Sequence, residues 1–202
     1  MTGSVAVLVS GSGTNLQALL DDPVVGPRIA LVVSSRSGVY ALERAHAKGI
    51  EAIIVDPDDH ADREAHDAAL LDELQRRSIG FVLLAGYMRI LSAGFVRHFE
   101  DRMLNVHPSL LPAFPGAHAE RDAMAYGVRV SGVTVHLARD EVDHGPIVLQ
   151  EPVIVLPDDD EDSLHRRVQE VEHRLYPRAA RLLLEGRLQV EGRRVHILEE
   201  PT

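Results

Sequence analysis

The sequence contains no cysteine, which excludes disulfides and thiolate zinc sites and fits a reducing compartment. Eleven histidines are present, but none stands in a His-Glu-x-x-His pattern or another familiar ligand spacing, so we expect no metal site. No apolar run approaches the length of a transmembrane helix, and no cationic segment precedes the first apolar run. We therefore expect neither membrane insertion nor export.

Clusters of basic residues are missing as well. The 21 Lys and Arg residues are scattered among 31 Asp and Glu residues, which gives a formal net charge of -10. Because nucleic-acid phosphates are normally bound by clustered Lys and Arg, we expect no nucleic-acid partner. The 202 residues suffice for one well-buried domain, and the sequence shows no internal repeat, low-complexity linker or second domain.

Apolar runs alternate with helical patterns along the chain. Short, nearly continuous apolar runs are typical of parallel strands that are covered on both faces. Alternating strands and helices predict an α/β fold with a Rossmann-like, mostly parallel sheet in the N-terminal half. Two later strands predict an antiparallel extension in the C-terminal half. The expected strands are 5–9, 30–33, 52–55, 81–85, 103–107, 133–137 and 147–155, and the expected helices begin near 16 and cover 40–48, 62–77, 118–126 and 163–184.

A glycine-containing loop follows the first expected strand. Residues 10–15 read Ser-Gly-Ser-Gly-Thr-Asn and lead directly into a helix, so backbone N–H groups and the positive helix end would face an anion, most plausibly a phosphate. The dinucleotide fingerprint is incomplete, because Leu16 stands where its third glycine would fall and Arg36 follows the second strand instead of an acid. The plain alternative is a tight turn without a ligand.

Three segments are expected at the carboxyl ends of the strands, where such sheets bind ligands: residues 11–15, 86–91 and 105–107. Residues two apart on a strand share a face, so Asn105 and His107 would point to the same side. An amide donor beside an imidazole suits a carbonyl carbon that becomes tetrahedral, since the oxyanion needs donors and the leaving group needs a proton. The alternative for this pair is simple capping of the loop.

Two further stretches add candidate residues. The turn at 139–146 carries three carboxylates, one of which could face His107 and favour the imidazolium, although a solvated acidic turn is the simpler reading. Gln169 and Glu172 lie three apart on the last helix and can face one ligand together. Pro177 is expected to kink or divide that helix, and the buried stripe of helix 62–77 is expected to hold Ala65, Ala69, Leu70 and Leu74.

Five segments in order resemble the phosphoribosylglycinamide formyltransferases, which are folate-dependent enzymes of purine synthesis. They are SGSGTNLQ (10–17), LAGYMRIL (84–91), NVHPSLLP (105–112), VDHGPI (142–147) and EHRLYP (172–177). The resemblance covers nearly the whole chain. It implies one formyltransferase domain over residues 1–202, with a phosphate-binding Rossmann-like half at 1–100 and a catalytic, folate-binding half at 101–202.

The resemblance also implies a role for each matching residue. His107 would be the general acid, Asp143 the carboxylate that raises its pKa, and Asn105 a donor to the oxyanion. Gly13, Thr14 and Asn15 would bind the substrate phosphate, with Gln169 and Glu172 on its ribose or glycinamide portion. The residues that would contact the folate are Arg63, Met88, Arg89, Ile90, Leu91, Asn105, Asp140 and Glu141.

The implied reaction moves a formyl group from 10-formyltetrahydrofolate, a cosubstrate, to the amine of phosphoribosylglycinamide, without a metal. The implied partners are these small molecules, the chain would be a monomer or homodimer, and the pathway implies a cytoplasmic location. Thr14, Ala113, Ala117 and His144 depart from residues common in the family but leave the three chemical positions intact.

Other readings remain open at this point. A formyl-folate hydrolase would use a similar Asn, His and Asp set with water as acceptor, and methionyl-tRNA formyltransferase shares the 109–112 region but needs a further domain and a basic surface. A non-catalytic phosphosugar- or NADP-binding module, with Arg36 near a 2′-phosphate, would need neither the Asn105 and His107 pair nor the acidic turn.

Overall fold

The computed structural model describes residues 3–199 and consists of one large sheet between two layers of helices. The seven strands of this sheet lie in the order β3-β2-β1-β4-β5-β6-β7, and a separate hairpin pairs β8 with β9. The bounds are β1 Ser4–Val9, β2 Ile29–Ser34, β3 Glu51–Ile54, β4 Ile79–Leu84, β5 Met103–His107, β6 Val130–Leu137, β7 Ile147–Ile154, β8 Leu188–Glu191 and β9 Arg194–Ile197, with helices α1 Thr14–Asp21, α2 Tyr40–Ala47, α3 Arg63–Arg76, α4 Ala93–His98, α5 Ala119–Tyr126 and α6 Glu161–Leu184 and single 3-10 turns at Gly26–Arg28 and Pro57–Asp59.

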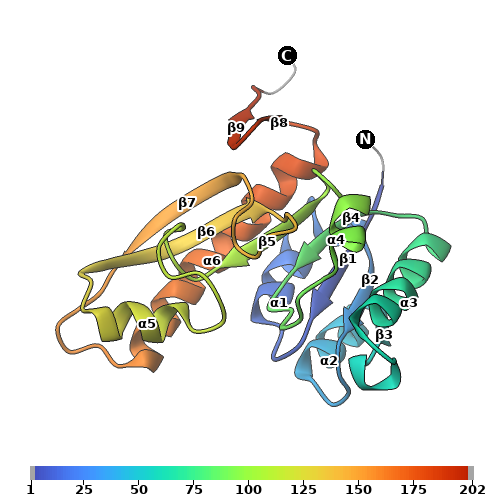
Figure 1. Ribbon diagram of the computed structural model, residues 1–202, viewed down its shortest axis with the longest axis horizontal. Helices are drawn as coiled ribbons and strands as arrows, with labels where there is room; N and C mark the ends of the chain where they lie inside the picture. The colour runs from blue at the N-terminus through green and yellow to red at the C-terminus, as the bar shows by residue number, and fades with distance from the viewer. Residues whose placement is uncertain (1–2, 200–202) are drawn as a thin grey trace.

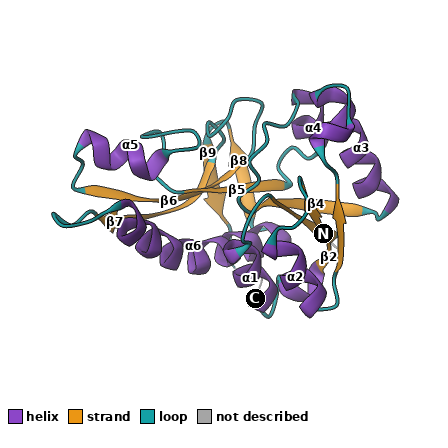
Figure 2. Ribbon diagram, turned by 90° about the horizontal axis from the view of Figure 1, so that it is seen from below, coloured by secondary structure: helices purple, strands orange, loops and turns teal. Residues whose placement is uncertain are grey.

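The sheet confirms the expected fold class, with mostly parallel strands and an antiparallel extension. Strands β1 to β5 pair in parallel, whereas β5 with β6 and β6 with β7 pair antiparallel. Successive side chains of β1 point to opposite faces of the sheet, as in any strand, so odd- and even-numbered residues pack in different hydrophobic cores. Val5, Val7 and Val9 pack with α1, α2 and α6, and Ala6 and Leu8 pack with α3 and α4. Figure 2 shows α1, α2 and α6 on one face and α3, α4 and α5 on the other.

Helix α6 crosses beneath the sheet and connects its two halves. Asp160 caps it by accepting a hydrogen bond from the Ser163 backbone N–H at 2.8 Å. Of the two effects expected of Pro177, a kink or a division, the division is wrong, because the helix continues through the proline to Leu184. Burial of Tyr176, Ala179 and Leu183 around the proline holds the turn against the sheet, which offsets the missing N–H donor.

Two further differences lie on the opposite face of the sheet. The stripe expected on α3 is wrong for Ala65, which is exposed, whereas His66 and Asp67 are buried beside Leu70 and Leu74. The pair is tolerated inside because the His66 Nδ1 and Asp67 Oδ1 atoms lie 2.9 Å apart. Helix α4 is not among the elements expected from the sequence. No helix within residues 3–199 is both long enough and apolar enough to span a bilayer.

The buried hydroxyl of Tyr176 connects α6 to the carboxyl end of β4 and to the second residue of β5. It lies 2.9 Å from the Leu84 carbonyl oxygen on β4 and 3.1 Å from that of Leu104 on β5, so it donates toward both. Tyr176→Phe should lower the free energy of unfolding by about 1–2 kcal/mol, because it removes this donor from buried acceptors. Urea unfolding checks this, with Tyr126→Phe as the control, since Tyr126 is 80% exposed. Equal stability of the two variants would contradict the prediction.

Candidate active site

A cavity of about 320 Å³ opens at the carboxyl ends of β4 and β5. Its walls come from three places: the segment after β4, the end of β5 with the loop behind it, and the turn between β6 and β7. Figure 1 shows these segments beside one another at the middle of the sheet. Most of the residues expected at the folate and catalytic positions line it, namely Met88, Arg89, Ile90, Leu91, Asn105, His107, Asp140, Glu141 and Asp143. Of the three segments expected at this edge of the sheet, 86–91 and 105–107 line the cavity, whereas 11–15 does not.

Strand β5 extends to His107, so Asn105 and His107 lie on one face as expected, and both line the cavity. The His107 ring is held by the loop that follows it. Its Nε2 atom lies 2.8 Å from the carbonyl oxygen of Phe114, and because a carbonyl only accepts, Nε2 carries the hydrogen. The Leu111-Pro112 peptide bond in this loop is cis.

Asp143 reaches the same face from the β6 to β7 turn. One of its oxygens, Oδ2, accepts a hydrogen bond from the Gly116 backbone N–H at 2.8 Å and lies 3.4 Å from His107 Nδ1. The other, Oδ1, is 3.5 Å from the Asn105 side-chain amide nitrogen. The acidic turn is thus not simply solvated: one of its carboxylates is buried against His107, which is the arrangement that the sequence left open.

Burial lowers the pKa of His107, and this effect outweighs the hydrogen bond to Phe114 and the charge of Asp143, which both raise it. Asp143 thus raises the pKa of His107, as expected, but burial determines the net direction. For Asp143 itself, burial raises the pKa, but the hydrogen bonds from His136 and Gly116 and the nearby imidazoles together lower it below its ordinary value. The site therefore holds a carboxylate beside a largely neutral imidazole.

His136 is a site residue that the sequence analysis missed. Strand β6 pairs it with Asn105 on β5, and its Nε2 atom lies 3.2 Å from the Asn105 amide nitrogen and 3.7 Å from Asp143 Oδ1. Its Nδ1 atom faces the Leu137 carbonyl at 3.0 Å. In the sequence, His136 stood out only as part of the alternating pattern of an expected strand. That pattern does not predict which residue of the neighbouring strand it contacts.

The segment after β4 forms an apolar wall of the cavity. Met88 and Ile90 are 65% and 60% exposed, although residues of this type are usually buried, which suits a slot for a flat ligand. The segment is fixed at both ends. The Met88 N–H donates to the Ser10 hydroxyl at 2.9 Å, and the Ser92 N–H donates to the buried Asp67 carboxylate. Asp67 was not expected to contribute.

Arg63 is the one expected folate residue outside this cavity. It begins α3, is exposed, and pairs with the neighbouring Glu64 at 3.1 Å. The structure therefore does not bring its guanidinium to the residues that line the cavity.

The expected phosphate loop lies at the start of α1. Gly13 is the N-cap with φ 73, and a Cβ at this position would lie 2.7 Å from the Cβ of Ala41, so both its conformation and its packing require glycine. Thr14 and Asn15 begin the helix and face α6. The Asn15 amide donates to Glu172 Oε2 at 2.8 Å, and the Gln169 amide donates to the Thr14 hydroxyl at 3.4 Å. The four residues expected to hold substrate around Gly13 are thus together.

Two cationic or titratable groups near this loop were also missed. Arg44 donates from Nε to the Ser12 carbonyl at 2.9 Å, so its positive charge lies beside the loop. His173 follows Glu172 on α6, and its buried Nε2 atom has no hydrogen-bond partner within the described residues. Burial, reinforced by the charge of Arg44, lowers the pKa of His173. Both groups add donors or positive charge to a site suited to an anion.

Glu172 is 6% exposed, and burial raises its pKa from 4.5 to about 7 against the opposing hydrogen bond from Asn15. Between these two values the folded chain holds a proton that the unfolded chain has released, so stability falls as the pH rises through that window.

Glu172→Gln removes this titration and keeps an acceptor for Asn15. The free energy of unfolding of the variant, relative to that of the parent, should be higher at pH 8 than at pH 5, by about 3 kcal/mol at most. Urea unfolding at both pH values measures the difference, and Glu170→Gln on the exposed side of α6 is the control. A stability difference between Glu172→Gln and the parent that does not change with pH would contradict the prediction.

Comparison with known proteins identifies the family. The formyl transferase family matches residues 4–180. The phosphoribosylglycinamide formyltransferase of Escherichia coli K12 is 40% identical over 191 residues, which are 93% of this chain and 90% of that protein. The phosphoribosylglycinamide formyltransferase of Mycobacterium tuberculosis is 42% identical over 190 residues, covering 94% of this chain and 88% of that protein.

A longer relative and a solved structure agree with this. The trifunctional purine biosynthetic protein adenosine-3 of Drosophila melanogaster is 46% identical over 90% of this chain, but this chain spans only 14% of that protein. The crystal structure of glycinamide ribonucleotide transformylase 1 from Symbiobacterium toebii superposes with a TM-score of 0.95 at 50% identity, covering 98% of this chain and 95% of that one. The chain therefore belongs to the formyl transferase family, together with the phosphoribosylglycinamide formyltransferases.

Proposed function

We propose that this chain transfers the formyl group of 10-formyltetrahydrofolate to the amine of 5-phosphoribosylglycinamide. The products are formylglycinamide ribonucleotide and tetrahydrofolate, in the purine pathway that the name of the Drosophila relative indicates. One observation carries the proposal: Asn105, His107 and Asp143 line one cavity, and a loop suited to an anion lies beside it. This loop, residues 10–15 before α1, is here called the anion cradle, and it is joined to a wall of the cavity by the hydrogen bond from the Met88 N–H to the Ser10 hydroxyl. The chain thus has adjacent places for a flat cosubstrate and a phosphorylated acceptor.

The phosphate is held by the backbone N–H groups at the start of α1, from Gly13, Thr14 and Asn15, where the helix dipole favours an anion. Gln169 and Glu172 hold the ribose or glycinamide portion, since both already contact that loop. The formyl folate occupies the slot made by Met88 to Leu91 and by the turn with Asp140 and Glu141.

In the reaction, the neutral amine of the acceptor attacks the formyl carbon, so a C–N bond forms and the carbonyl oxygen becomes an oxyanion. The Asn105 amide donates to this oxygen. His107 is neutral before attack, and the negative charge that develops beside it raises its pKa toward the protonated form. A proton released from the amine reaches folate N10 through His107, and the bond from the formyl carbon to N10 then breaks.

Asp143 positions His107 and compensates its positive charge during the reaction, at the 3.4 Å separation seen in the structure. Holding the amine and the formyl carbon together supplies a large part of the rate enhancement, because orientation alone is worth roughly 7–11 kcal/mol in favourable cases. No protein nucleophile is needed. We further propose that the chain acts in the cytoplasm as a monomer or homodimer, on small molecules rather than nucleic acid or membranes.

The direct test follows deformylation of a 10-formyl folate analogue by absorbance, with and without phosphoribosylglycinamide. Turnover only with the glycinamide is the expected result. Equal turnover without it would make water the acceptor and the chain a hydrolase. Absence of turnover in both cases, with saturable binding of NADPH, would contradict the proposal and favour a binding module.

The roles of the catalytic pair predict a specific split in the kinetic constants. His107→Ala and Asp143→Asn should each lower kcat by about 100-fold or more, with little change in folate affinity, because they act on the transition state. In Asp143→Asn, the pH dependence that belongs to His107 should move to lower pH, since the neighbouring negative charge is gone. Pre-steady-state turnover and folate titration measure these effects. Full activity of Asp143→Asn would contradict the role of Asp143.

A further inference from the structure

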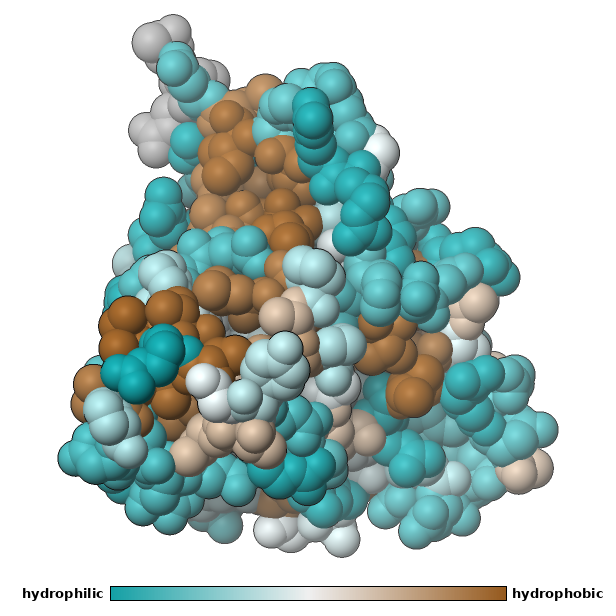
Figure 3. All heavy atoms as spheres, turned by 60° about the vertical axis from the view of Figure 1, so that its left-hand side comes forward, coloured by the Kyte–Doolittle hydropathy of each residue, from teal (hydrophilic) through white to brown (hydrophobic). Residues whose placement is uncertain are grey.

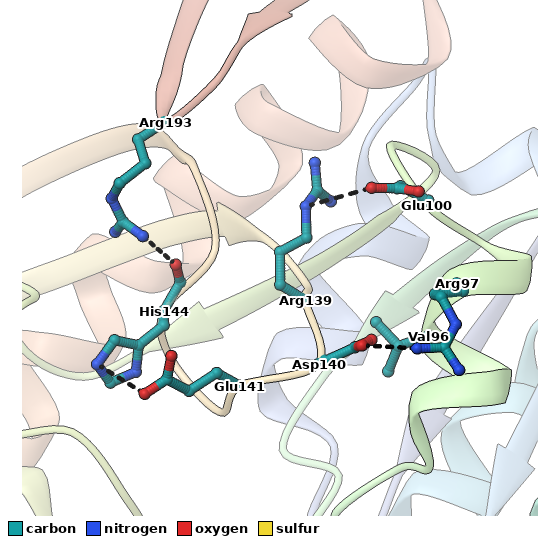
Figure 4. Close-up of a pocket in the computed structure, with 8 residues that line it drawn as sticks. All are labelled: Val96, Arg97, Glu100, Arg139, Asp140, Glu141, His144 and Arg193. Carbon is teal, nitrogen blue, oxygen red and sulfur yellow. Dashed lines mark hydrogen bonds and ion pairs between the residues drawn. The ribbon is translucent and has the colours of Figure 1, made fainter.

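We propose that Arg193, in the turn of the terminal β8 to β9 hairpin, is a positioning residue that holds the loop carrying Asp143. Its guanidinium Nη1 donates to the carbonyl oxygen of His144 at 2.7 Å. Figure 4 shows this contact across a cavity of about 380 Å³ that lies next to the folate slot. The inference rests on the proposed function, in which Asp143 must face His107.

The backbone of Asp143 lies in a sparsely populated region. Asp143 has φ 58, a left-handed conformation that aspartate adopts more often than most residues but that is still uncommon. Such a conformation persists when the surrounding contacts determine it. The contact from Arg193 falls on His144, the residue directly after Asp143, so it acts where the unusual conformation is set.

The other contacts of the loop lie on different sides of Asp143. The Arg97 guanidinium on α4 is 2.9 Å from Asp140 Oδ2, which fixes the entry of the loop. At the exit, a Cβ on Gly145 would lie 1.6 Å from the Leu137 carbonyl oxygen, so the chain there is pressed against the end of β6. Arg193 completes this arrangement by holding the segment between these two points. Figure 4 shows Arg97 and Arg193 on opposite sides of the loop.

The hairpin itself is a firm base for this contact. Leu188, Val190 and Val195 are partly buried and pack against the main core, although β8 and β9 form a sheet of their own. Gly192 turns the chain with φ 61, which places Arg193 at the tip. Because the hairpin is packed against the core, the position of Arg193 is fixed, and its hydrogen bond can fix the position of the loop at His144. The same arginine on a mobile tail could not do so.

The test compares Arg193→Met with Arg193→Lys and with Arg194→Met, which removes the neighbouring charge of the same hairpin. Arg193→Met should lower kcat at least about fivefold, because small displacements of a catalytic group have large effects on rate. The KM for phosphoribosylglycinamide should stay within about twofold, since the α1 site is remote from the hairpin turn. Arg193→Lys should recover most of the activity, and Arg194→Met should match the parent.

A second measurement needs no turnover. The imidazole of His107, which faces the charged Asp143 and the ring of His136, is titrated by NMR in the ligand-free chain. In Arg193→Met its pKa should move down, because the carboxylate that raises it is no longer held in place, and in Arg194→Met it should not move. Unfolding midpoints of all variants should agree, since Arg193 is exposed.

The outcomes separate the two proposals. A parent without transferase activity would defeat the proposed function, and the His107 titration would still test Arg193. An active parent in which Arg193→Met matches Arg194→Met in both kcat and His107 titration would overturn the role of Arg193 alone. Should Arg193→Met fail to fold, Arg193→Lys against Arg193→Gln gives the same comparison, and equal kcat and titration in that pair would overturn the proposal.

Discussion

The buried carboxylate of Asp143 is the interaction on which the site depends. A charge removed from water needs partners, and this one finds the Gly116 N–H, the His107 ring and the Asn105 amide, which come from the loop after β5 and from β5 itself. Three segments that are separate along the chain are thus oriented by one group. Interactions with His136, Gly116 and His107 lower the pKa of Asp143, while burial lowers the pKa of His107.

The parallel half of the sheet explains why the two substrate places are adjacent. Strands β1, β4 and β5 are neighbours, so their carboxyl ends lie on one edge, with the anion cradle after β1 and the apolar slot after β4. Helix α6 packs on one face of the sheet and contacts residues near that edge. It brings Glu172 to Asn15, and one turn later its Tyr176 hydroxyl reaches Leu84 at the end of β4 and Leu104 near the start of β5. The acceptor side and the catalytic side therefore share one helix.

The antiparallel half adds the chemistry that the parallel half lacks. Pairing of β6 with β5 places His136 beside Asn105, and the turn from β6 to β7 carries Asp143. That turn is long and its anchors are distributed among α4, the loop after β5 and the terminal hairpin. Figure 3, which brings the side with α5, β6 and β7 forward, shows that hydrophobic side chains also gather in patches on this surface. Exposed apolar residues on these elements include Tyr126, Val130 and Ile154.

The sequence alone determined most of the fold and the principal site residues. Local periodicity identified the strands and most of the helices, and the rule for parallel sheets placed residues 11–15, 86–91 and 105–107 at one edge. Only the tertiary structure decided the contacts of His136, Asp67 and Arg193, the position of Arg63 outside the cavity, and the net direction of the His107 pKa. The physical reason is that these properties arise from burial and from contacts between residues far apart in the chain, which local patterns do not encode.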